Sequence, residues 1–206
     1  MQLEAKNIGF RYDKESWIFR NRNLSLSSGE VVGLIGPSGC GKTTFARMLA
    51  GYMQPFEGQV LLNNAPLPKK GYQPVQLVFQ HPEKAVNPKW RMKKILTEGG
   101  KFDDEWLELI GIKKEWLRRW PNELSGGELQ RFCVARALGA HTQFLIADEM
   151  TTMLDAITQA QIWHAVLDVA RKRNIGILVI SHEQPLINRL CDRVIHFSGN
   201  NSGDDQ

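Results

Sequence analysis

Three short hydrophobic runs, each followed by polar residues, predict the middle of a parallel β-sheet. The runs span residues 31–35, 144–147 and 177–180. Their apolar side chains alternate little with polar ones, which is typical of strands that helices bury on both faces. Since the carboxyl ends of parallel strands carry the functional groups in such sheets, the polar residues that end each run are the first candidates for a site.

The segments around these runs predict an α/β architecture. Residues 2–12 and 24–26 alternate more between apolar and polar positions, which predicts an N-terminal antiparallel β subdomain. Residues 83–123 are rich in both acidic and basic side chains, and their apolar spacing predicts short amphipathic helices. We therefore expect a nucleotide-binding core over residues 1–82 and 124–206, with residues 83–123 inserted as a small helical subdomain.

The composition is that of an ordinary globular protein. Of its 206 residues, 42% are hydrophobic and 23% are charged, which suits a single domain over residues 1–206 and excludes a wholly disordered chain. The net charge of +4 is well short of that of a dedicated nucleic-acid binder but is compatible with an anionic ligand. Three scattered cysteines are too few for a disulfide framework or a zinc site, and no segment approaches the roughly 20 apolar residues that cross a bilayer.

The turn after the first hydrophobic run matches a phosphate-binding motif. Its sequence, GPSGCGKT over residues 36–43, fits G-x-x-x-x-G-K-[ST] and lies between a predicted strand and a helix predicted over residues 43–50. The glycines let backbone N–H groups turn around a phosphate, Lys42 would reach the β- and γ-phosphates, and the Thr43 hydroxyl would ligate Mg²⁺. The alternative is a glycine-rich turn with a surface lysine. The candidate nucleotide-binding residues of this segment are Gly36, Pro37, Ser38, Gly39, Cys40, Gly41, Lys42, Thr43 and Thr44.

Two adjacent carboxylates end the second hydrophobic run, in the manner of a Walker B strand. Asp148 stands where a carboxylate can hold Mg²⁺, directly or through water. Glu149, one residue further on, can accept a proton from the attacking water or orient it. The alternative is that this pair of carboxylates merely caps the next helix.

A second glycine-rich segment, LSGGE at residues 124–128, leads into a helical pattern. Serine and glycine at a helix start form a backbone anion site, which here has no lysine of its own. Two phosphate-binding loops with one lysine predict that two molecules share each nucleotide. The alternative is a helix N-cap with a glycine-rich entry. The candidate residues of this loop are Ser125, Gly126, Gly127 and Glu128.

These motifs in this order, with His182 after the third run, resemble the ATP-binding subunit of an ATP-binding cassette (ABC) transporter over residues 6–197. The resemblance implies that the α/β fold is a P-loop NTPase (RecA-like) core. It implies that Tyr12 stacks on adenine, and that Gln80, which would also contact Mg²⁺, and His182 act beside Glu149 in catalysis. The alternatives are a partly buried core position for the tyrosine, a plain loop amide for the glutamine and a structural histidine.

The resemblance also implies contacts between subunits and a branch of the family. Ser125 and Gly127 would contact the nucleotide that the other subunit binds, and Asp155 would belong to the D-loop at the same interface. Met150 stands where the family usually has proline and Met153 replaces a small D-loop residue, which could alter the geometry of that loop. The residues that resemble the peptide/nickel importer branch are Gln80, Asn87, Pro88, Thr151, Thr152, Leu154, Asp155, Gln159, Ala160, Gln161 and Ile162.

The function that this resemblance implies is coupling of ATP hydrolysis to import of a small solute, most like a peptide, nickel or a metal chelate. The cofactors would be ATP and Mg²⁺. The partners would be integral-membrane permease subunits, a second ABC ATPase subunit that is identical or related and, indirectly, a substrate-binding protein, with no nucleic acid. The chain would lie peripherally on the cytoplasmic face of the cell membrane. The alternatives are a non-transport ABC ATPase subunit of a soluble complex and a degenerate partner that binds ATP without hydrolysing it.

Overall fold

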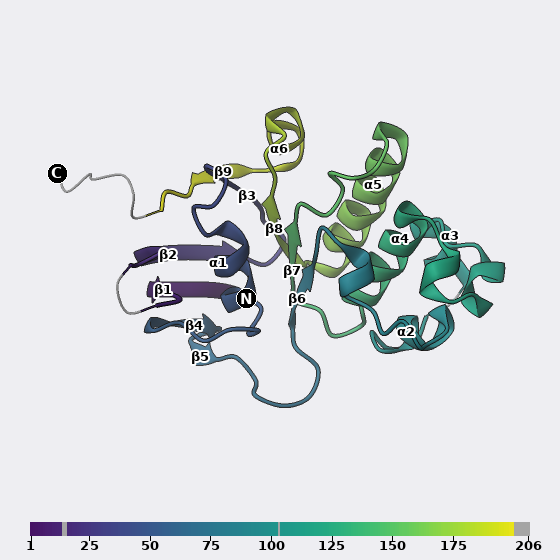
Figure 1. The fold of residues 1–206 in the computed structure, drawn as a ribbon, viewed down its shortest axis with the longest axis horizontal. Helices are drawn as coiled ribbons and strands as arrows, with labels where there is room; N and C mark the ends of the chain where they lie inside the picture. Colours follow the sequence, from purple (N-terminus) through teal and green to yellow (C-terminus); the bar gives the residue numbers. More distant parts are fainter. Residues whose placement is uncertain (14–15, 103, 200–206) are drawn as a thin grey trace.

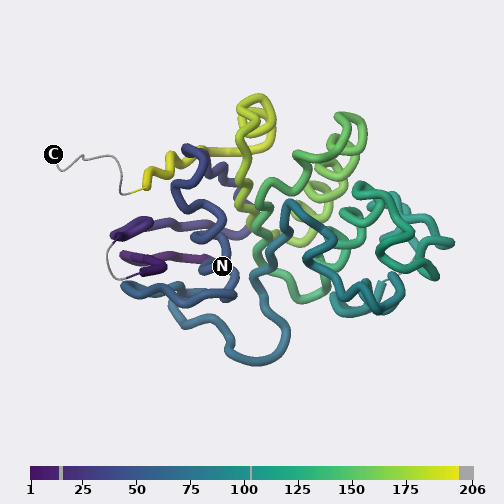
Figure 2. The backbone as a smooth tube through the Cα atoms, in the orientation of Figure 1, coloured from purple at the N-terminus to yellow at the C-terminus, as the bar shows by residue number. Residues whose placement is uncertain are grey.

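The computed structural model describes residues 1–13, 16–102 and 104–199, which form two β-sheets and a set of helices (Figures 1 and 2). In chain order the elements are β1 (Gln2–Phe10), β2 (Phe19–Ser27), β3 (Val31–Ile35), α1 (Lys42–Leu49), β4 (Glu57–Leu62), β5 (Ala65–Pro66), β6 (Val75–Val78), η1 (Pro82–Lys84), α2 (Met92–Thr97), α3 (Asp104–Ile110), η2 (Lys114–Arg118), η3 (Pro121–Glu123), α4 (Gly126–Ala137), β7 (Phe144–Asp148), α5 (Ala156–Arg173), β8 (Gly176–Ile180), α6 (Gln184–Leu190) and β9 (Arg193–His196).

The parallel sheet contains the three predicted strands and two more, in the order β6-β7-β8-β3-β9. The predicted runs are its β3, β7 and β8, so the parallel core is confirmed. Asp148 pairs with Ile180, and Ile180 pairs with Leu34, so three carboxyl ends are in register. The residues that follow these strands therefore lie at one edge of the sheet, as expected for a site of this architecture.

Alternate residues of the central strands pack into two different cores. On β7, Phe144 packs with α1 and the antiparallel sheet, whereas Leu145 packs with α4 and α5. On β8, Leu178 and Ile177 divide in the same way. All four side chains are fully buried. This two-sided burial explains why the runs are apolar without alternation.

The antiparallel sheet has the order β2-β1-β4-β5, which confirms the expected antiparallel strands at the N-terminus. Figure 1 shows α1 between this sheet and the parallel one. Phe45 and Met48 of α1 share a core with Leu3 and Ile8 of β1 and with Phe144 of β7. The helix that follows the phosphate-binding motif is thus fixed from both sides.

Short helices make up the described part of residues 83–123, as their apolar spacing predicts; residue 103 lies outside the description. They pack onto α4 and α5, on the far side of the parallel sheet from the antiparallel one (Figure 1). Trp116 is buried in this core, while Trp106 and Trp120 are half-buried. The helical segment therefore continues the core of α4 and α5 outward.

Candidate nucleotide-binding site

The phosphate-binding loop connects β3 to α1 and needs glycine at two of its positions. Gly39 and Gly41 have φ of 79° and 103°, the left-handed region that favours glycine. A Cβ on Gly41 would lie 2.7 Å from the Phe19 ring and 2.8 Å from Ile18 Cγ2. The loop is therefore seated directly on β2, and at Gly41 both the backbone conformation and the space exclude a side chain.

Lys42 lies inside the loop, so the surface-lysine alternative is wrong. Its side chain is buried, and its ammonium donates hydrogen bonds to the carbonyls of Gly36 and Pro37, each at 2.8 Å. Cys40 is buried behind it, with its thiol 3.5 Å from the Phe197 carbonyl oxygen. These contacts place a positive charge at the centre of the loop, where the backbone can cradle a phosphate.

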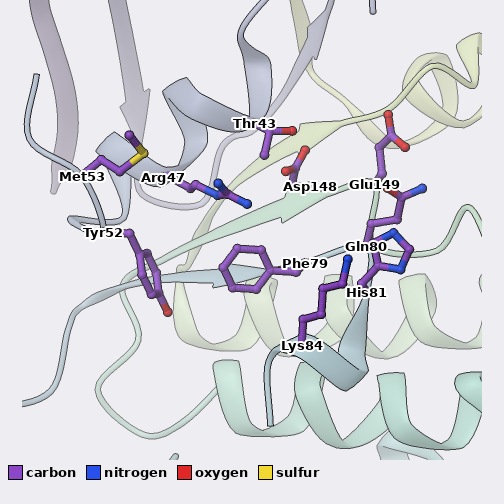
Figure 3. A pocket seen from close by; sticks show the side chains of 10 residues that line it. All are labelled: Thr43, Arg47, Tyr52, Met53, Phe79, Gln80, His81, Lys84, Asp148 and Glu149. Carbon is purple, nitrogen blue, oxygen red and sulfur yellow. The ribbon is translucent and has the colours of Figure 1, made fainter. Parts of the chain in front are cut away.

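Thr43 and Asp148 face each other across the edge of the sheet (Figure 3). The Thr43 hydroxyl is hydrogen-bonded to the Asp148 carboxylate. Burial raises the pKa of Asp148 and the Glu149 charge adds to this, while the hydrogen bond from Thr43 opposes it. The carboxylate of Asp148 and the hydroxyl of Thr43 are both hard oxygen ligands. A divalent cation bound between them would stabilise the charged form of Asp148.

Glu149 and His182 meet at the ends of β7 and β8. The Glu149 Oε1 and His182 Nε2 atoms are 2.9 Å apart. Glu149 has a φ of 50°, unusual for a residue with a side chain, and its N–H donates to the Ile180 carbonyl at 2.9 Å. The carboxylate thus leaves the strand by a left-handed turn toward the neighbouring strand end.

Gln80 lies two residues beyond β6, at the same edge. Its amide donates to the Thr152 hydroxyl at 3.3 Å, and that hydroxyl donates to the Glu149 carbonyl at 3.1 Å. The glutamine is therefore linked to the segment that follows Glu149, which a plain loop amide need not be.

Many of the residues described so far line two adjoining hollows, which share Thr43 and Glu149. The P-loop hollow, of about 300 Å³, is lined by Tyr12, Ile18, Ser38, Gly39, Gly41, Lys42, Thr43, Thr44, Glu149 and His182. The Asp148 hollow, of about 600 Å³ and drawn in Figure 3, is lined by Thr43, Arg47, Tyr52, Met53, Phe79, Gln80, His81, Lys84, Asp148 and Glu149. Together they offer a continuous surface from the predicted adenine position to the candidate Mg²⁺ ligands.

Tyr12 lies at the outer end of the P-loop hollow and is 68% exposed, so a partly buried core position is wrong. Its hydroxyl is 3.2 Å from the Thr44 hydroxyl, and its ring packs perpendicular to that of Phe10, with 5.0 Å between the ring centroids. The ring is thus held beside α1 with a face available for stacking.

Six residues that line the Asp148 hollow were not predicted from the sequence: Arg47, Tyr52, Met53, Phe79, His81 and Lys84. In Figure 3 the Arg47 side chain points across the hollow toward Asp148. Helical spacing could have found this residue, because Arg47 follows Thr43 by one turn of α1 and so shares its face. Tyr52 and Phe79, whose rings pack at 5.7 Å, are brought together only by the fold.

The loop before α4 is a helix N-cap, as its alternative interpretation holds. Ser125 accepts from the Glu128 N–H at 3.3 Å and Glu128 accepts from the Ser125 N–H at 2.8 Å, which is a capping box. A cap does not exclude anion binding, because the first N–H groups of a helix lack partners within it. Among the described residues, none of 125–128 lines either hollow.

Asp155 caps α5, where its carboxylate accepts from the N–H groups of Ile157 at 3.1 Å and Thr158 at 2.9 Å. The helix after Asp148 and Glu149 is thus capped by another residue, and the capping alternative for that pair is wrong. The hydrogen bonds from Thr158 hold the pKa of Asp155 below its usual range. A Cβ on Gly127 would lie 3.4 Å from Leu154 and 3.5 Å from Thr158, so the two caps adjoin.

Comparisons with known proteins identify the family. The sequence profile of the family described as "ABC transporter" matches residues 19–152. The nickel import system ATP-binding protein NikE of Staphylococcus aureus strain bovine RF122 / ET3-1 is 34% identical over 94% of this chain and 85% of its own, and that of strain N315 is 32% identical over the same shares. These relatives bear out the resemblance drawn from the motifs.

Solved structures agree with the fold. An ATP-binding subunit of an ABC transporter superposes with a TM-score of 0.82 at 19% identity, covering 96% of this chain and 86% of its own. A bacterial ABC transporter cassette solved as a dimer has a TM-score of 0.80 at 23% identity, covering 95% and 94%. The predicted P-loop NTPase (RecA-like) α/β fold is thereby confirmed.

Proposed function

This chain belongs to the ABC transporter family as one of its ATP-binding and ATP-hydrolysing subunits, and on that premise we propose how it works and what it serves. Two cassettes bind two MgATP molecules between them, and hydrolysis drives a separate permease. The observation that carries the proposal is the division of the motifs. Lys42, Thr43, Asp148, Glu149 and His182 converge on two adjoining hollows, while the loop at residues 125–128 lies outside both.

The P-loop side of the site positions ATP. The backbone of residues 36–43 and the Lys42 ammonium hold the β- and γ-phosphates, with Tyr12 stacked on adenine. Thr43 and Asp148 would hold Mg²⁺, and Gln80 would contribute to the same site. Within the described ranges no group of three or more His, Cys, Asp or Glu could hold a metal ion, which suits Mg²⁺ since it keeps several waters and takes phosphate ligands from its nucleotide.

Glu149 acts as the general base. Glu149 accepts the proton of the attacking water. His182, whose Nε2 atom is 2.9 Å from the Glu149 carboxylate, orients that carboxylate and contacts the γ-phosphate. The N-terminus of α4 stabilises the γ-phosphate of the nucleotide on the other cassette through Ser125 and Gly127. Asp155, which caps α5 beside Gly127, acts at the same interface through the loop that leads into this helix. ATP thus favours the closed pair, and hydrolysis with product release lets it open.

The permease is a separate chain, and we propose that it docks where the Asp148 hollow opens toward the helical segment. No helix of the described residues is long and apolar enough to cross a membrane. His81 and Lys84, which follow Gln80 in the chain, line this hollow, so a partner bound there would contact the segment that senses the nucleotide. The chain would then lie on the cytoplasmic face of the membrane.

The transported solute is nickel or a nickel chelate, fed to the permease by a substrate-binding protein. The support is the name shared by relatives that are 32–34% identical over 94% of this chain. Transport of ⁶³Ni by cells that express the complete importer, with and without Lys42→Ala in this subunit, tests this assignment. Equal uptake of nickel with and without an active subunit would contradict it.

The ATPase proposal is tested with Glu149→Gln, which keeps the size and hydrogen-bonding shape of the side chain but removes the base. We expect this variant to bind MgATP, to lose turnover and to accumulate a dimer in size-exclusion light scattering. Glu108→Gln, on an exposed position of α3, is the matched control and should behave as the wild type. Turnover of Glu149→Gln at the wild-type rate would overturn the role of Glu149, and an ATP-bound monomer would overturn pairing of this chain with itself.

A further inference from the structure

Gln130 is a buried polar residue that none of the proposed roles uses. It lies on α4, one turn after the Ser125 cap, and is only 1% exposed. Its amide nitrogen donates to the Met150 carbonyl at 2.7 Å and to the Phe79 carbonyl at 3.2 Å. Both N–H groups of the amide therefore reach the backbone of segments that follow strands β7 and β6.

These two carbonyls flank the catalytic end of the sheet. Met150 directly follows Glu149, and Phe79 directly precedes Gln80. Glu149 has a φ of 50°, a conformation that a residue with a side chain adopts at a cost in energy and keeps only when its surroundings hold it. The Ile180 carbonyl holds this turn from one side, and the bond from Gln130 holds it from α4.

The amide oxygen of Gln130 indicates that this residue is not present in order to stabilise the fold. Its Oε1 atom is buried and has no hydrogen-bond partner within the described structure. An unpaired buried acceptor is destabilising, so each such group in a folded protein calls for an explanation. A role at the adjacent catalytic turn supplies one.

We propose that Gln130 is a positioning residue for Glu149, which ties the turn at residues 149–150 to helix α4. This proposal rests on the roles proposed above for Glu149 and for the start of α4. Since the N-terminus of α4 meets the nucleotide of the opposite cassette, the tie lets that nucleotide set the orientation of the carboxylate in this one. Gln130 itself touches neither nucleotide.

The test is the Gln130→Met substitution, which keeps the length of the side chain and removes both donors. We expect kcat for MgATP to fall by about 10- to 100-fold, as for a catalytic group displaced by about 1 Å, with KM within about twofold of the wild type. Thr142→Val is the matched control, because it removes another buried hydrogen bond to a backbone carbonyl, that of Ala137 at 2.6 Å, and Thr142 lies before β7, at the opposite end of that strand from the catalytic turn. It should lower the unfolding temperature without changing kcat.

A double-mutant cycle separates positioning from general damage. Single-turnover hydrolysis is measured for the wild type, Gln130→Met, Glu149→Gln and the double variant. If Gln130 acts through Glu149, its substitution slows the wild type but leaves the residual rate of Glu149→Gln unchanged. Equal slowing in both backgrounds, or wild-type kcat in Gln130→Met, would overturn the proposal.

Three further outcomes are covered by these variants. If Gln130→Met does not fold, Gln130→Asn takes its place, because it retains the amide but is one methylene too short to reach both carbonyls, and the same cycle decides. If Glu149→Gln alone turns over ATP normally, the proposed role of Glu149 fails and the Gln130 proposal falls with it. If Glu149→Gln is inactive and Gln130→Met is kinetically normal, only the Gln130 proposal is wrong.

Discussion

The seating of the phosphate-binding loop on β2 can be tested by comparing Gly41→Ala with Gly39→Ala. Both glycines have left-handed backbone, with φ of 103° and 79°. A Cβ on Gly39 would meet nothing within 4 Å, whereas a Cβ on Gly41 would lie 2.7 Å from Phe19 and 2.8 Å from Ile18. The two substitutions thus share the conformational cost and differ in the steric one.

The magnitudes follow from these two terms. The left-handed conformation costs an alanine roughly 1–2 kcal/mol relative to glycine, and the loss of freedom in the unfolded chain offsets this by about 0.4–1 kcal/mol. Gly39→Ala should therefore lower the free energy of unfolding by about 1 kcal/mol. At Gly41 the overpacking against the fully buried Phe19 adds roughly 1–3 kcal/mol.

The assay is urea unfolding of the two variants and the wild type, with thermal unfolding as a check. For a domain of this size, each 1 kcal/mol of destabilisation shifts the melting temperature by about 2–4 °C. We expect Gly41→Ala to be less stable than Gly39→Ala by at least about 1 kcal/mol and to bind ATP weakly. If the two variants were equally stable, the close approach of the loop to Phe19 would not constrain it and the argument from Gly41 would be refuted.

The remaining predictions concern the charges of the site. Lys42→Ala leaves the Gly36 and Pro37 carbonyls without their donor and the phosphates without their cation, so we expect loss of ATP binding in calorimetry; normal affinity would contradict the assignment. Burial raises the pKa of Asp148, so the folded state binds more protons than the unfolded state and the free energy of unfolding falls as the pH rises from the ordinary aspartate pKa to the raised one. Asp148→Asn should therefore be more stable than the wild type at pH 7 without Mg²⁺ and should lose this pH dependence in urea unfolding between pH 4 and 7, while Mg²⁺-dependent hydrolysis disappears. A less stable variant would show that the carboxylate contributes more through Thr43 than it costs by burial.

Parts of the fold that depend on a continuous apolar pattern were predictable from sequence. The three central strands are buried on both faces, so nearly all of their residues are apolar and the runs are easily recognised in the sequence. β6 and β9 were not expected because they are short and less regular: β6 includes the half-buried Gln76, and Arg193 and His196 of the edge strand β9 are exposed. Short strands at a sheet edge form because they pair with a neighbouring strand, and their own residue pattern does not reveal that partner.

The residues of the candidate site also differ in whether the sequence alone could predict them. Residues within a motif, such as Lys42 and Thr43, could be assigned because their spacing along the chain fixes their positions around a phosphate. Gln130 could not be assigned, because its two hydrogen bonds join residues 20 and 51 positions apart in the chain. The left-handed turn at Glu149 also leaves no mark in the sequence, since that conformation is usually signalled by glycine or asparagine.

The identity of residue 150, a methionine, bears on whether the site hydrolyses ATP. A methionine where the family usually has proline raises the alternative of a degenerate subunit, which would bind ATP without hydrolysing it. The structure uses position 150 in two ways: its carbonyl accepts the bond from Gln130, and its side chain is buried in the core of α4 and α5. Proline and methionine supply the same carbonyl, and methionine adapts readily to the shape of a core. Methionine at this position therefore leaves the hydrogen bond between Gln130 and the turn of Glu149 in place, and the 2.9 Å contact between Glu149 and His182 is present as well. Both observations favour hydrolysis by this subunit over the degenerate alternative.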